Sequence, residues 1–146
     1  MKALKKNTLV ILLGCILFFG GSIISLARKL TSGVNIQLSN FIYQLDTTLI
    51  PILVIVICVM IITGKVIKNL KKLNIVLFIC TIVLVIHRVY LVYVDIRSLI
   101  IAVTTIENLE TSYLISKIIN VLGSVAGFVV MIISTYLAYK NLRAIK

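Results

Sequence analysis

The sequence is short of charged residues, aromatic residues and proline. Only 13% of its 146 residues are charged, just four of these are acidic, tryptophan is absent and proline occurs once. So little polar surface cannot cover a water-soluble globule, which excludes a soluble enzyme and a disordered tail. Hydrophobic residues make up 61% of the chain, and its mean hydropathy is +1.20. The composition therefore predicts an integral membrane protein with short loops.

Cysteine is also scarce, and its placement excludes two further classes. Cys15, Cys58 and Cys80 each lie inside an apolar run rather than in a loop. A disulfide-stapled domain or a zinc site needs clustered cysteines or histidines, so we interpret these three as small buried hydrophobic residues. No GxGxxG, P-loop, HExxH or CxxC motif occurs, and His87 is the only histidine. We predict no metal, no cofactor and no enzymatic activity.

Four apolar stretches predict four transmembrane helices, over residues 8–27, 41–64, 73–94 and 116–139. Each is long enough to cross about 30 Å of hydrocarbon at about 1.5 Å per residue. Main-chain groups in lipid must bond to one another, which requires helices. The predicted fold class is an all-α polytopic membrane protein, with residues 1–146 forming one domain. We expect an antiparallel four-helix bundle.

The distribution of charge predicts the orientation of the chain. Ten of the 15 basic residues fall in the two terminal segments and the loop between the second and third spans, and all four acids fall on the other side. Basic loops stay in the cytoplasm, so both termini are predicted to be cytoplasmic in a plasma membrane. The net charge of +11 then reflects anionic lipid at the cytoplasmic face rather than nucleic acid. Abundant lysine and isoleucine fit a low-GC bacterium.

The first apolar stretch has a second interpretation. Its lysine-rich start, followed by an apolar run and Ser25-Leu26-Ala27, resembles a cleavable secretory signal. The run is about 20 residues long, longer than the apolar core of most signals. We therefore expect an uncleaved span.

Residues 96–117 form the one sizeable segment outside the four predicted spans. Apolar residues recur there at helical spacing, which predicts an outward helical extension around residues 96–110. The extension is either a continuation of the third helix or a separate helix on the membrane surface. Its charged residues, Arg97, Glu107 and Glu110, are the candidate contacts for a partner.

His87 and Arg88 mark a candidate polar site inside the membrane. Arg88 lies about 22 Å into the third span, where a charge must pair, reach the headgroups or face a cavity. An antiparallel second span brings Asp46 within a turn of that depth, so we predict an Arg88–Asp46 ion pair. The pair is either a site for a substrate, ion or proton, or a structural link between helices, and we favour the structural link. The candidate site also includes Tyr43, Gln44 and Asn120.

Small residues predict where helices pack closely in lipid. Gly123 and Gly127 form a GxxxG step in the fourth span, and Gly21 and Ser25 give the first span a similar face. This face is either an interface between copies of the chain or a contact within one copy. The pattern alone does not choose between the two.

The absence of catalytic motifs favours a protein that acts by contact. The leading hypothesis is a membrane protein that binds a membrane protein or peptide, as a toxin or bacteriocin self-immunity protein or as an accessory subunit. The analogy rests on size and topology alone. The alternative is an oligomeric transporter or channel for ions or small solutes, since four spans are too few to enclose a wide pore.

Overall fold

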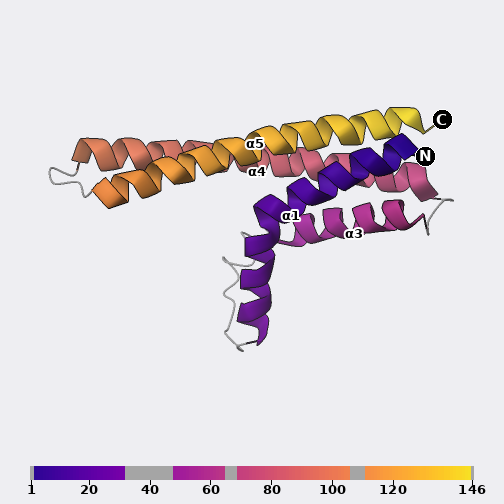
Figure 1. Cartoon of the computed structure of the whole chain (residues 1–146), viewed down its shortest axis with the longest axis horizontal. Helices are drawn as coiled ribbons and strands as arrows, with labels where there is room; N and C mark the ends of the chain where they lie inside the picture. The colour runs from indigo at the N-terminus through magenta and orange to yellow at the C-terminus, as the bar shows by residue number, and fades with distance from the viewer. Residues whose placement is uncertain (1, 32–47, 65–68, 106–110, 146) are drawn as a thin grey trace.

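The computed structural model describes residues 2–31, 48–64, 69–105 and 111–145. In these ranges the chain forms four helices and no strand: α1 (Lys2–Thr31), α3 (Ile50–Thr63), α4 (Leu70–Thr105) and α5 (Thr111–Ala144) (Figure 1). Helices α1, α4 and α5 each contain a stretch long and apolar enough to cross a membrane. The all-helical prediction is confirmed. These three helices give the chain the character of a membrane protein.

Helix α3 is shorter than the other three. Its 14 residues span about 21 Å, less than the hydrocarbon thickness. Pro51 sits in its first turn, where a missing N–H is tolerated. Gly64 ends it at a φ of 72°, a left-handed conformation that favours glycine, and donates its N–H to the Ile61 carbonyl. Of the predicted span 41–64, residues 41–47 lie outside the described residues.

Helices α4 and α5 form a long antiparallel hairpin (Figure 1). They contain 36 and 34 residues, about 54 and 51 Å, so both exceed the thickness of the hydrocarbon core. The rings of Phe78 and Tyr139 lie 5.9 Å apart towards one end, and Lys117 donates to Ser98 towards the other. The two helices therefore keep one register along most of their length. Helix α4 is unbroken to Thr105, so residues 96–105 continue the predicted third span.

Helices α1 and α3 cover only the half of this hairpin that lies beside the chain ends (Figure 1). Helix α1 contacts α3 and α5, and α3 also contacts α4. Their shared core contains Ile11, Cys15, Val54, Leu77 and Leu84, among other buried residues. Among the described helices, the other half of the hairpin has α4 and α5 alone. Among the described residues, four helices thus pack together at one end, and α4 and α5 alone continue to the other.

Helix α1 bends sharply near its middle, and its second half leaves the bundle (Figure 1). Gly20, Gly21 and Ser22 follow the middle of the helix, and adjacent residues of low helix propensity are a recognised cause of kinks. The first half is packed, with Ile11, Cys15 and Phe19 buried. Beyond the glycines, Ile24 and Ser25 are exposed. The bend therefore separates a packed half of α1 from an unpacked half.

Candidate functional site

Arg88 is the most deeply placed charged side chain among the described residues. It lies on α4, is only 7% exposed, and reaches across to the bend of α1. Its Nη2 donates a hydrogen bond to the carbonyl oxygen of Phe18 at 2.7 Å. Phe18 stands just before Gly20, Gly21 and Ser22, so this bond forms near the place where α1 changes direction. Arg88 therefore links α4 to α1.

Aromatic rings and a glycine complete the surroundings of the guanidinium. Its Cζ lies 4.5 Å from the centre of the Phe19 ring and 5.3 Å from that of Phe18, both within range of a cation–π contact. Gly127 of α5 faces the group so closely that a Cβ there would lie 2.9 Å from Nη1. The charge is thus enclosed by three helices.

The structure places only part of the predicted polar site beside Arg88. His87 is buried next to it on α4, whereas Asn120 is exposed on α5. The bonds Lys117–Ser98 and Ser124–Asp95 bracket Asn120, which puts it about two helical turns from the level of Arg88. Tyr43, Gln44 and Asp46 lie outside the described residues. The Arg88–Asp46 pair stays a prediction.

A charge exchange tests that pair. Arg88→Asp should strongly destabilise the protein, because two acids would then face each other in a medium of low dielectric. Adding Asp46→Arg should restore part of the lost stability, measured as resistance to unfolding in detergent. If the double variant is no more stable than Arg88→Asp alone, the pairing is wrong.

Only part of the predicted small-residue face is closely packed in the structure. Gly127 is packed against Arg88 and Phe18, but an added Cβ at Gly123 or Gly21 would meet nothing within 4 Å. Ser25 is exposed. Gly14 is the other closely packed glycine among those the structure describes, because a Cβ there would lie 2.8 Å from Val130 Cγ1. Close contact of α1 with α5 therefore depends on Gly14 and Gly127.

Polar contacts also join α4 and α5 beyond the level of Arg88. Ser124 donates a hydrogen bond to Asp95, and Lys117 Nζ donates to Ser98 Oγ at 2.7 Å. Lys117 also lies over the ring of Tyr113, at 5.3 Å. These bonds hold the two helices together where α1 and α3 no longer support them.

The far part of this hairpin exposes an apolar surface. We call residues 96–105 of α4 and 111–119 of α5 the hairpin end. Arg97 is exposed there, while Glu107 and Glu110 lie outside the described residues. The large exposed apolar side chains of the hairpin end are Ile96, Ile100, Ile101, Val103, Tyr113, Ile115, Ile118 and Ile119.

A second polar cluster, at the opposite end of the bundle, joins the two ends of the chain. Asn7 donates to the side-chain oxygen of Asn141 at 2.9 Å, and Asn141 donates to Thr8 at 3.2 Å. Thr8 in turn donates to the Leu4 carbonyl. Asn141 and Thr8 are buried, so the cluster fixes α1 against α5 with satisfied hydrogen bonds.

Sequence reasoning missed the aromatic partners of Arg88 and the asparagine cluster. A partial signal existed for the first, since Phe18 and Phe19 stand near the middle of the first span, about 15 Å along it, and Arg88 lies about 22 Å along the third, within reach of its long side chain. Asn7 and Asn141 lie at the ends of their predicted spans, where an amide is as easily solvated as paired. Their pairing is a tertiary feature that neither segment reveals alone.

The described residues hold no group of three or more histidine, cysteine or acidic residues that could bind a metal. All three cysteines are free and buried. No family model, curated protein or solved structure matches this chain.

Proposed function

We propose that this chain is a multi-pass membrane protein that acts by binding another membrane protein or a membrane-active peptide. The observation that carries the proposal is the hairpin end, which stands clear of α1 and α3 among the described helices and exposes apolar side chains (Figure 1). Ile96 lies 24 residues after Lys72, about 36 Å along α4, beyond the thickness of the hydrocarbon core. A contiguous apolar surface outside lipid is typical of an interaction site.

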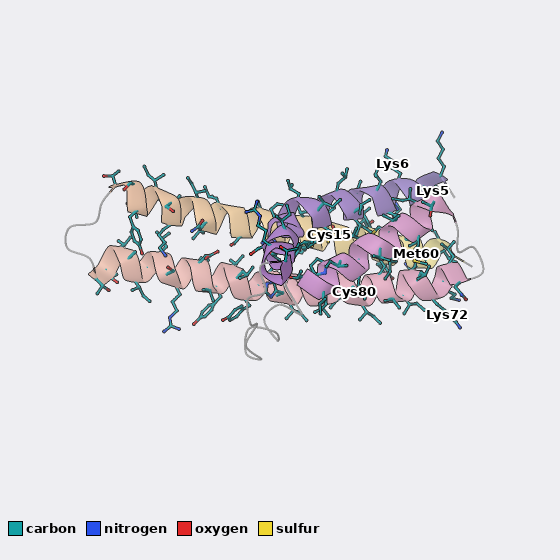
Figure 2. All side chains as sticks on the ribbon, turned by 90° about the horizontal axis from the view of Figure 1, so that it is seen from below. Lys5, Lys6, Cys15, Met60, Lys72 and Cys80 are labelled. Atoms are coloured by element: carbon teal, nitrogen blue, oxygen red, sulfur yellow. The ribbon has the colours of Figure 1, made fainter. Side chains whose placement is uncertain are left out.

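The arrangement of basic residues supports an orientation with both termini in the cytoplasm. Figure 2 shows Lys5, Lys6 and Lys72 at one end of the bundle, and Figure 1 shows the N- and C-termini at that same end. A basic end of this kind faces the cytoplasm and its anionic lipid under the positive-inside rule. The hairpin end then projects outside the cell.

Exposure to the outside favours partners that arrive there or assemble there. A self-immunity protein must meet a toxin or bacteriocin at the membrane, and an accessory subunit must meet the outer part of its complex. Both roles need a binding surface rather than a catalytic centre. The abundance of lysine and isoleucine supports a bacterial plasma membrane as the setting.

Site-specific photocrosslinking in native membranes tests the proposal. A photoreactive residue at Ile119, in the hairpin end, should attach to a foreign protein that mass spectrometry identifies. The matched control is Leu17, which is 75% exposed but lies on the half of α1 that covers the bundle. It should attach to lipid only. Equal labelling of protein from both positions, or none from Ile119, would contradict the proposal, and adducts between copies of the chain alone would favour the oligomeric channel.

A further inference from the structure

A groove lies between α4 and α5 near the start of the hairpin end. Its volume is about 420 Å³, and its lining includes Tyr90, Tyr93, Arg97, Ser98, Ala102 and Tyr113. Ala102 is buried, while the three tyrosines and Arg97 are exposed. The groove therefore combines an apolar floor, aromatic walls and one cation at its rim.

Lys117 of α5 places a second positive charge beside the groove. Lys117 Nζ bonds to Ser98 Oγ at 2.7 Å and lies over the Tyr113 ring at 5.3 Å, and both residues line the groove. The nearest acid along α4, Asp95, accepts a hydrogen bond from Ser124 and is not among the lining residues. Among the described lining residues Arg97 carries the one charge, so the lining itself is positive and favours an anionic ligand.

The depth of the groove indicates what kind of anion reaches it. Tyr93 lies 21 residues after Lys72, about 32 Å along α4, which matches the hydrocarbon thickness. Tyrosines gather at the boundary between hydrocarbon and headgroups, and Tyr90 and Tyr93 lie at this level. Tyr113 lies further out, about one turn beyond the Lys117–Ser98 bond. The anions abundant at that depth are phospholipid phosphates.

We propose that this groove binds the headgroup of an anionic phospholipid, in the leaflet far from the chain termini. Arg97 donates to the phosphate, since a guanidinium suits the paired oxygens of that group. Tyr90 and Tyr93 contact the glycerol and the first methylenes of the acyl chains. Lys117 adds positive charge from α5. This inference is independent of a protein partner for the hairpin end.

The absence of tryptophan from the chain gives a clean test. Tyr93→Trp introduces the single tryptophan of the chain into the groove. The variant is reconstituted with brominated phosphatidylglycerol or brominated phosphatidylcholine, and either lipid quenches the tryptophan on contact. We expect a relative binding constant about fivefold in favour of phosphatidylglycerol. Adding Arg97→Gln should reduce that preference to about one. Arg97 is exposed, so the added substitution should leave folding unchanged.

Tyr136→Trp is the matched control, because Tyr136 is 61% exposed and Tyr93 60%, but Tyr136 lies on α5 towards the chain end. Arg97→Gln should not change lipid preference there. The proposal is overturned if the Tyr93→Trp variant shows no preference, or if Arg97→Gln leaves its preference intact. Displacement by millimolar inorganic phosphate would overturn it in favour of a soluble-anion site. If neither lipid quenches the tryptophan at position 93 and the protein has twice the mass of one chain, the proposal is overturned in favour of a contact between copies of the chain.

Discussion

Phe19→Ala should lower the free energy of unfolding by about 3–5 kcal/mol. The Phe19 ring is 2% exposed and packs in the core shared by α1, α3, α4 and α5. Removing it leaves a cavity and strips the Arg88 guanidinium of its nearer aromatic ring, which lies 4.5 Å away. The charge would then be buried with less compensation. Titration with a denaturing detergent measures the loss.

Leu17→Ala is the control, because Leu17 lies two residues away on the same helix and is 75% exposed. We expect a change within about 0.5 kcal/mol. Thiol modification gives a second readout, since Cys15, Cys58 and Cys80 are all free and buried and react only when the bundle opens. Their labelling should accelerate in Phe19→Ala and not in Leu17→Ala. Equal effects in the two variants would show that Phe19 is not a core residue.

Gly127→Ala should lower the free energy of unfolding by about 1–3 kcal/mol, the usual range for overpacking. The added Cβ would lie 2.9 Å from Arg88 Nη1 and 3.0 Å from Phe18 Cδ1. The guanidinium must move to make room, and the movement strains its hydrogen bond to the Phe18 carbonyl. The same detergent titration measures the effect.

Gly123→Ala, one helical turn away in the same GxxxG step, should have the opposite sign. Nothing lies within 4 Å of a Cβ at Gly123, so alanine adds helix propensity without a clash. We expect a gain of up to about 1 kcal/mol. Destabilisation by both substitutions to the same degree would instead place Gly123 in a contact of its own, such as one between copies of the chain.

Hydropathy and run length were enough to predict an all-helical chain able to cross a membrane. A helix in lipid must be long and apolar, and consecutive residues alone show whether that requirement is met. Helix α3 was the hardest to delimit. Its predicted span starts at residue 41, although Gln44, Asp46 and Thr47 interrupt the apolar run shortly before the helix begins at Ile50.

Burial could not be predicted, because lipid-facing and protein-facing positions are equally apolar. Leu17 and Phe19 have similar hydrophobicity, yet one is exposed and the other is core. The hydrophobic pattern that separates the two faces of a soluble helix is missing when the solvent is itself hydrocarbon. The same limit applies to Gly123 and Gly127, since the motif does not distinguish its two positions.

Arg88 shows where sequence reasoning succeeds and where it ends. Its depth is a prediction from counting residues along one helix, and the structure buries its side chain between helices. Its contacts with Phe18 and Phe19 depend on the bend of α1 and on the space left by Gly127. A bend direction is decided by which neighbours a helix meets, and no single segment contains that information.

The hydrogen bond between Asn7 and Asn141 joins residues 134 positions apart. During synthesis Asn7 enters the membrane long before its partner exists. At about 5–20 residues per second, ribosomes need about 7–27 s to make the intervening chain. Over that interval the amide of Asn7 must rest among headgroups, the insertion machinery or water. The hydrogen bond that fixes the N-terminal helix can therefore form only after the C-terminal helix is complete. A nascent chain truncated before Asn141 would have a first span without this bond, and such a chain would be a substrate for quality-control proteases.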